Sequence, residues 1–150
     1  MIIPLWAILA FSASILWGLS YAISGKLMQE GMTPSFLTAF CTVVTLPFYL
    51  FILMKFGNLQ GNIDLLAANK KYIWLLLVES AAIITGVFLI YMSIQQKNAT
   101  YSSVIEITYP VFVCFFVWLL FRDIQLNWNL ALGGLMIFAG SAIVLLKSNG

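Results

Sequence analysis

Apolar and polar positions alternate in long blocks along this chain rather than residue by residue. Each apolar block is about 20 residues long, and a helix of that length crosses the roughly 30 Å hydrocarbon core of a bilayer. The blocks predict an all-α, polytopic membrane protein with a single domain over residues 1–150. Its five predicted transmembrane helices lie at about residues 2–26, 34–54, 72–94, 100–121 and 128–146.

Short polar connections between the blocks indicate where helices begin. Thr33 followed by Pro34 predicts an N-cap and a first helical residue for the second span. Pro47 interrupts that span and predicts a kink in it. In the longest polar segment, Asp64 predicts the cap of a short surface helix over the four residues that follow. Asn127 predicts the cap of the last span.

The composition agrees with a location in the bilayer. Hydrophobic residues make up 63% of the chain and charged residues only 8%, against roughly 25% charged residues in soluble domains. The net charge of +2 is too small to favour nucleic acid as a partner. Cys41 and Cys114 fall within apolar blocks, where we interpret them as small buried hydrophobic residues rather than a disulfide or a metal pair. We expect no metal, no cofactor and no cleaved signal peptide.

The positive charges give little information about orientation. An odd number of spans places the two termini on opposite sides of the membrane. Because Lys and Arg normally collect on the cytoplasmic side, a nearly equal distribution predicts that the chain inserts in both orientations. The side of the N-terminus then holds four such residues (Lys55, Lys70, Lys71 and Arg122), and the other side holds three (Lys26, Lys97 and Lys147).

The fourth apolar block carries the most unusual residues, Glu106 and Pro110. An ionisable side chain deep in a membrane helix costs on the order of 3 kcal/mol, so by default it indicates a function. Proline has no N–H, and the carbonyl of Glu106, four residues earlier, therefore loses its helical partner. Helical spacing places Ser102, Ser103 and Tyr109 on the face of Glu106. The alternative is a structural carboxyl, bonded to Tyr109 or to a serine of another helix.

A second carboxyl, Glu79, lies in the third apolar block. It shares a helical face with Ala82, Gly86 and Ser93, which makes that face small and polar. Removal from water favours the neutral form of a carboxyl, so both glutamates are candidates for proton exchange. For Glu79 the alternative is structural, because it lies roughly 10 Å from the helix end and can reach interfacial water or a lysine (Lys70 or Lys71).

Several short motifs occur in an order and spacing that resemble a known membrane domain. They are Trp17-Gly18-x-Ser20-Tyr21 with Lys26, Asn98-Ala99-Thr100-Tyr101-Ser102-Ser103-Val104, Tyr109-Pro110-Val111-Phe112, Phe121-Arg122-Asp123-Ile124-Gln125-Leu126, Gly133-Gly134 and Ala139-Gly140. Together they resemble the EamA-type domain of the drug/metabolite transporter superfamily over essentially the whole chain. At the turn before the last helix, Arg122-Asp123 replaces that domain's usual Gly-Glu.

The resemblance implies an assembly. Larger EamA-type proteins carry two five-span halves in inverted orientation around a substrate path, and this chain corresponds to one half. Small multidrug members of the superfamily resemble it in the last helix, where Gly133 and Gly140 match glycines that mediate dimerisation. Those members exchange protons for cationic drugs through a glutamate in their first helix, whereas residues 2–25 here contain no acid.

We therefore expect a secondary transporter in a cell membrane, the inner membrane if the source is bacterial. It would export small organic metabolites or amphipathic solutes with proton coupling, as a homodimer (antiparallel included) or a heterodimer. The alternative is an accessory subunit that packs against a different small membrane protein. An enzyme is not expected, because the chain has no His and the two membrane glutamates differ in depth by roughly 10 Å. The candidate residues are Glu106, Tyr109, Glu79, Ser103, Trp17 and Tyr21 for substrate or protons, Pro110 and Pro47 for helix kinks, and Gly133 and Gly140 for the dimer interface.

Overall fold

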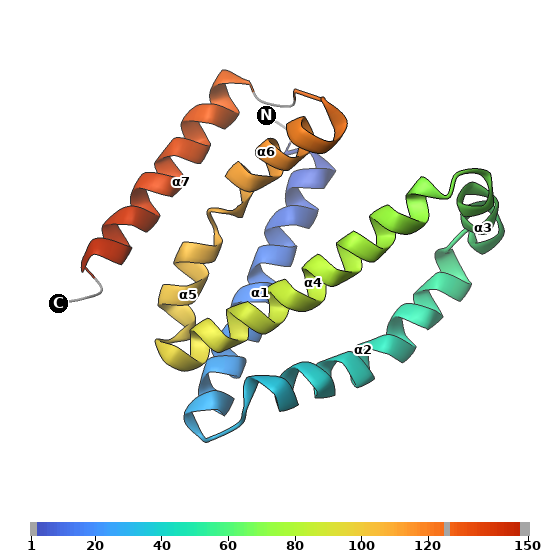
Figure 1. The fold of residues 1–150 in the computed structure, drawn as a ribbon. Helices are drawn as coiled ribbons and strands as arrows, with labels where there is room; N and C mark the ends of the chain where they lie inside the picture. The colour runs from blue at the N-terminus through green and yellow to red at the C-terminus, as the bar shows by residue number, and fades with distance from the viewer. Residues whose placement is uncertain (1–2, 125–126, 148–150) are drawn as a thin grey trace. The chain divides into compact units, whose positions relative to one another are not determined.

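The fold is given by a computed structural model that describes residues 3–124 and 127–147. Within these residues every secondary-structure element is a helix (Figure 1). Five helical stretches are long and apolar enough to cross a membrane: α1, α2, α4, the combined α5 and α6, and α7. The prediction of an all-α protein with five transmembrane helices is thus confirmed. The helices are α1 (Leu5–Gln29), α2 (Pro34–Phe56), α3 (Leu59–Ala68), α4 (Lys71–Gln96), α5 (Ala99–Glu106), α6 (Tyr109–Phe121) and α7 (Trp128–Lys147).

Two of the predicted helix starts are found where the side chains indicated them. The hydroxyl of Thr33 accepts a hydrogen bond of 3.4 Å from the N–H of Phe36, and Pro34 begins α2. The side chain of Asn127 accepts from the N–H of Leu130 at 2.8 Å, just before α7. Each cap satisfies one of the N–H groups that have no partner inside the helix. Both predicted caps are confirmed.

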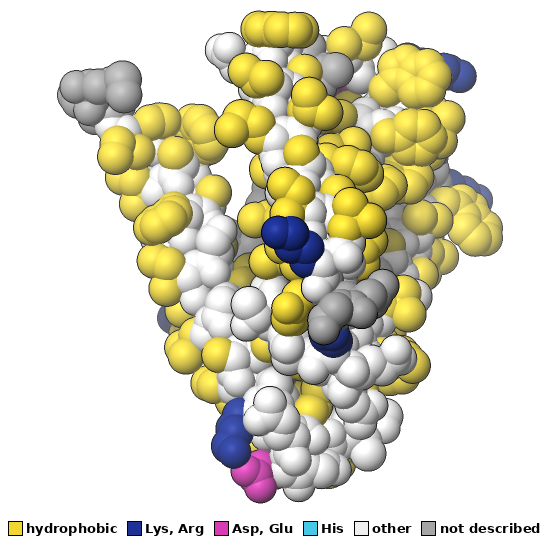
Figure 2. Space-filling view, turned by 90° about the vertical axis from the view of Figure 1, so that its left-hand side faces the viewer, with side chains coloured by type: hydrophobic (Ala, Val, Ile, Leu, Met, Phe, Trp, Pro, Cys, Tyr) yellow, Lys and Arg dark blue, Asp and Glu magenta, His cyan; other side chains and the backbone are white. Residues whose placement is uncertain are grey.

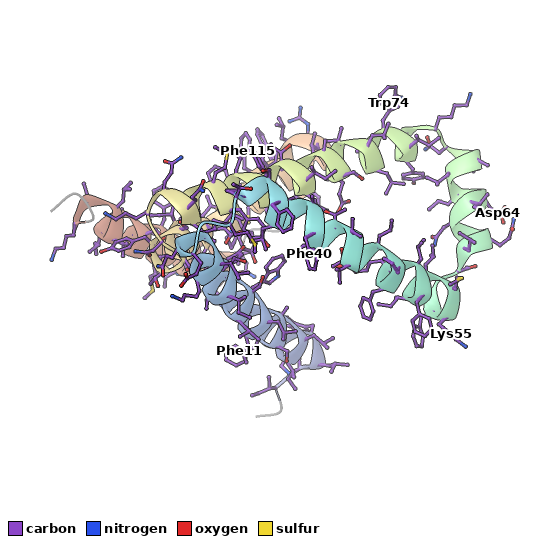
Figure 3. The ribbon with its side chains drawn as sticks, turned by 90° about the horizontal axis from the view of Figure 1, so that it is seen from below. Phe11, Phe40, Lys55, Asp64, Trp74 and Phe115 are labelled. Atoms are coloured by element: carbon purple, nitrogen blue, oxygen red, sulfur yellow. The ribbon has the colours of Figure 1, made fainter. Side chains whose placement is uncertain are left out.

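The short helix α3 begins earlier than the sequence suggested. Its cap is Asn58, whose side chain accepts from the N–H of Gly61 at 3.1 Å. Asp64 lies inside α3, where its carboxylate accepts from the side-chain amide of Gln60 at 2.9 Å. The prediction that Asp64 caps this helix is wrong, because Asn58 offers an equivalent acceptor earlier in the same polar segment. Figure 3 shows Lys55 near the C-terminal end of α2 and Asp64 on α3.

Pro47 lies inside α2, and the helix continues beyond it to Phe56. Its missing N–H leaves the carbonyl of Val43, four residues earlier, without the usual donor. The nearby hydroxyl of Thr45 turns back to the carbonyl of Cys41 at 2.8 Å. A kink at Pro47 stays a prediction.

The chain divides into two compact units. One contains Met1–Lys26 and Ser93–Gly150, and therefore most of α1, the end of α4, and α5 to α7. The other contains Leu27–Met92, with α2, α3 and most of α4. In the first unit, α5 packs against α7.

Most large apolar side chains of the described residues are exposed. Phe56 is 83% exposed and Leu146 is 80% exposed. Hydrophobic side chains cover most of the face seen in Figure 2, and Phe11, Phe40 and Trp74 project from their helices in Figure 3. Water does not tolerate so large an apolar surface, whereas lipid does. The protein is a multi-pass membrane protein. Among the described residues, the large apolar side chains that are buried are Tyr21, Met28, Leu37, Tyr91 and Ile94.

Candidate functional site

The fourth span is broken in its first half. α5 ends at Glu106, α6 begins at Tyr109, and two residues between them leave the helix (Figure 1). Pro110 is the second residue of α6. At this position a proline is tolerated, because the first N–H groups of a helix have no intrahelical partner. The sequence predicted a kink in one continuous helix, and the structure has two helices with a turn between them.

Several backbone groups of the turn have hydrogen-bond partners within the described residues. Thr108 bonds the carbonyl of Ile105 twice, through its N–H at 3.2 Å and its hydroxyl at 2.8 Å. The N–H of Ile107 donates to the carbonyl of Ser103 at 3.0 Å. In the described chain no backbone N–H donates to the carbonyl of Glu106. That free carbonyl is the one that the proline predicted.

The side chain of Glu106 has a partner on α1. The hydroxyl of Tyr21 donates a hydrogen bond of 2.8 Å to Oε1 of Glu106. Tyr21 is only 8% exposed, and its ring lies 5.7 Å from the ring of Trp17, centroid to centroid. Three of the candidate residues therefore meet within one unit. The partner of the carboxyl is neither Tyr109 nor a serine, which were the partners considered for a structural carboxyl.

The remaining candidate residues lie elsewhere. Ser103 bonds the carbonyl of Thr100 in its own helix at 3.0 Å. Tyr109 follows the break, so the continuous helical spacing that placed it beside Glu106 does not apply, and its side chain is 60% exposed. Glu79 is exposed in the other unit, and among the described residues it makes no hydrogen bond or ion pair.

Three further contacts hold α5, and the sequence did not identify them as part of the site. The hydroxyls of Ser102 and Ser93 share a hydrogen bond of 2.8 Å. The hydroxyl of Ser141 on α7 donates to the carbonyl of Val104 at 2.8 Å. A Cβ added to Gly25 of α1 would lie 3.1 Å from the Cβ of Ala99, so a larger residue at this position would require the neighbour to shift by a few tenths of an ångström. The signal available in the sequence was a small or hydroxyl residue within an apolar span.

Two positive groups near this unit's helix ends, those of Lys97 and Arg122, lie over aromatic rings. The ammonium of Lys97 is 5.2 Å from the ring centre of Tyr101, and the guanidinium of Arg122 is 5.4 Å from the ring centre of Trp118. Such contacts are attractive by about 0.5–1 kcal/mol at exposed positions. Glu106 itself forms no ion pair within the described residues.

The candidate glycines of α7 and the two cysteines make no contact with Glu106 among those found in the described chain. A Cβ added to Gly133 or Gly140 would meet no atom within 4 Å, so that face of α7 is open in the single chain. Cys41 and Cys114 are free and half-buried. No group of three His, Cys, Asp or Glu side chains suited to a metal ion occurs in the part of the chain that is described.

The chain belongs to the EamA-like transporter family, whose sequence model matches residues 4–146. Comparisons with curated proteins and with solved structures gave no match. The family is one of transporters and is generally non-enzymatic. The resemblance seen in the sequence motifs is confirmed, and the five spans belong to a membrane protein of a transporter family.

Proposed function

We propose that this chain is a secondary transporter that exports small organic metabolites or amphipathic solutes in exchange for protons, and that it works as a dimer. Glu106 is the proton-carrying group. The observation that carries this proposal is the hydrogen bond from Tyr21 to Glu106 beside the break between α5 and α6. A carboxyl and a broken helix within one span are both costly in lipid, so they persist where they serve a path through the membrane.

The partners of Glu106 suit a group that gains and loses a proton. The hydroxyl of Tyr21 donates a hydrogen bond to Oε1. A hydrogen bond to a charged group contributes about 1.5–3 kcal/mol. No lysine or arginine of the described chain pairs with the carboxyl, so its charge is not permanently compensated. The aromatic side chain of Trp17, beside Tyr21, supplies apolar surface for an organic solute.

A dimer follows from how transporters of this kind build their sites. Inverted repeats commonly place the substrate site at the interface between two halves, near the middle of the bilayer. The four-to-three distribution of Lys and Arg lets identical chains insert in opposite orientations. Reporter fusions at the C-terminus should be active on both sides of the membrane. Activity on one side only contradicts the antiparallel homodimer and requires a partner chain of opposite orientation.

The coupling is tested with purified protein in proteoliposomes. Glu106→Gln keeps the size and much of the hydrogen bonding of the side chain but fixes its charge at zero. A pH gradient should then no longer drive solute flux, while solute binding persists. Glu79→Gln tests the second candidate in the same assay, and Glu30→Gln, outside the spans, is the control. Intact pH-driven flux in Glu106→Gln shows that Glu106 is not the proton carrier.

The accessory-subunit function is favoured by one observation, the open glycine face of α7, which fits a helix of any partner. The two functions differ in what the purified chain does alone. A transporter that works as a homodimer moves solute in liposomes that contain only this chain. An accessory subunit neither transports nor self-associates until its partner is added.

A further inference from the structure

The last residue of α5 places a negative side chain at the negative end of a helix. The aligned peptide dipoles of a helix give its C-terminal end a partial negative charge, which attracts cations and repels carboxylates. Glu106 is the C-terminal residue of α5. We propose that the carboxylate of Glu106 and the open carbonyl at the end of α5 bind a small monovalent cation, either an alkali-metal ion or a protonated primary amine. The proposal rests on the proposed function only in placing this site on the transport path.

The carbonyl groups at the end of α5 show where such a cation would bind. The last four carbonyls of a helix have no intrahelical donor and need other partners. The carbonyl of Ser103 accepts from the N–H of Ile107, and the carbonyl of Val104 accepts from the hydroxyl of Ser141. The carbonyl of Ile105 accepts from the N–H and the hydroxyl of Thr108. The carbonyl of Glu106 is the one left without a donor in the described chain. An unsatisfied carbonyl costs several kcal/mol in lipid, so it requires a partner from outside the backbone.

The side chain of the same residue provides the second ligand. Oε1 accepts from Tyr21 at 2.8 Å, and Oε2 has no partner within the described residues. A proton on the carboxylate neutralises the charge but does nothing for the backbone carbonyl. A cation bound by both Oε2 and the backbone carbonyl oxygen of Glu106 neutralises the negative charge and also gives the carbonyl a partner. In discontinuous transmembrane helices, free carbonyls and helix C-terminal ends commonly hold small cations in this way.

The chemistry of the site selects the class of ligand. Oε2 and the carbonyl oxygen of Glu106 are hydrogen-bond acceptors only. A ligand held by these two oxygens must therefore be a hard cation or a donor of several hydrogen bonds. An alkali-metal ion and a primary ammonium both meet this requirement, whereas a quaternary ammonium has no N–H to offer. Choline is thus a matched control ion that carries the same charge.

Binding is measured on the full-length protein in detergent, without transport. Trp17 reports on the site because its ring lies 5.7 Å from that of Tyr21. The remaining tryptophans (Trp6, Trp74, Trp118 and Trp128) are changed to Phe, and fluorescence is followed while NaCl, KCl or methylammonium chloride replaces choline chloride at constant ionic strength. We expect a saturable change with at least one of these cations, weakened tenfold or more in Glu106→Gln and unchanged in Glu30→Gln.

Thermal unfolding of the protein with all its tryptophans provides a second measurement, because a ligand that binds only the folded state raises the unfolding temperature. A response to the alkali salts alone identifies a coupling ion, and a response to methylammonium alone identifies the amine of a substrate. Equal responses to choline and to the small cations, or an unaltered response in Glu106→Gln, overturn the inference. Proton-driven flux that depends on Glu106 but lacks cation binding leaves the proposed function intact and removes only this site.

Discussion

Ser141 of α7 donates a hydrogen bond of 2.8 Å to the backbone carbonyl of Val104 in α5, across 37 residues of sequence. Within the described part of the chain, Ser141 is one of three buried polar side chains, with Ser24 and Ser102. The carbonyl of Val104 lies in the last turn of α5, and the hydroxyl of Ser141 is its hydrogen-bond donor. The last span is thereby tied to the helix that ends at Glu106, so its position bears on the geometry of the candidate site.

Removing this hydroxyl should destabilise the protein modestly. Ser141→Ala leaves the carbonyl of Val104 without its donor, and hydrogen bonds between transmembrane helices contribute about 0.5–1.5 kcal/mol. We expect a loss of about 1 kcal/mol in the free energy of unfolding, measured by denaturant titration in detergent. The control is Ser14→Ala, because the hydroxyl of Ser14 bonds only the carbonyl of Ala10 in its own helix. Equal losses in both variants contradict a specific role of the bond between α5 and α7.

Arg122 offers a test of backbone strain. It has a φ of 57° at the end of α6, the left-handed region, and it is the one non-glycine residue with positive φ in the described chain. Glycine adopts this conformation without the roughly 1 kcal/mol that other residues lose. Arg122→Ala removes the contact with Trp118 and keeps the strain, whereas Arg122→Gly removes both. We expect the glycine variant to be more stable than the alanine variant by about 1 kcal/mol.

The control for this comparison is an ordinary helical glycine. Gly18 lies inside α1, and a Cβ there would meet no atom within 4 Å. Alanine is a better helix former than glycine by about 0.8–1 kcal/mol, so Gly18→Ala should raise stability. The preference between glycine and alanine is thus expected to reverse between residues 18 and 122. The same preference at both positions shows that φ of Arg122 is not left-handed in the membrane protein.

The open face of α7 leads to a prediction about self-association. Gly133 and Gly140 lie two helical turns apart, and close approach of backbones at small residues is a common basis of helix pairing in membranes. Gly140→Leu should weaken the dimer about tenfold or more, equivalent to ~1.4 kcal/mol. Sedimentation in detergent measures this, with Gly18→Leu as the matched control at another open glycine. Unchanged association in Gly140→Leu places the interface on another face.

The spans and the identity of the family could be predicted because both depend on local patterns. Twenty apolar residues in a row are sufficient for a transmembrane helix, and a cap such as Thr33 depends on a hydrogen bond to a residue three positions later. Asp64 shows the limit of this reasoning. Asn58 precedes it with an equivalent side chain, and local preferences alone did not decide between them.

The pairing at the site could not be predicted, since it depends on contacts between distant helices. Tyr21 and Glu106 are 85 residues apart, and no periodicity within either helix indicates that they meet. Pro110 predicted the free carbonyl of Glu106 correctly. It did not reveal that two residues would leave the helix, because a kink and a break both follow from a missing N–H. Because Tyr109 follows the break, the spacing of one continuous helix no longer relates its position to that of Glu106.

Substitution of Pro110, the proline after the break, should affect the unfolding temperature and the transport rate differently. Pro110→Ala restores an N–H four residues after Glu106, where it can donate to the free carbonyl and join α5 to α6 in one helix. We expect the variant to unfold at the same or a higher temperature and to transport more slowly, because the carbonyl is no longer free. Pro47→Ala is the matched control, since Pro47 also lies within a span but far along the chain from Glu106. It should leave the dependence of flux on Glu106 unchanged. Wild-type flux in Pro110→Ala, with helix joining shown by amide hydrogen exchange at residues 107–111, means that the open carbonyl is not used in transport.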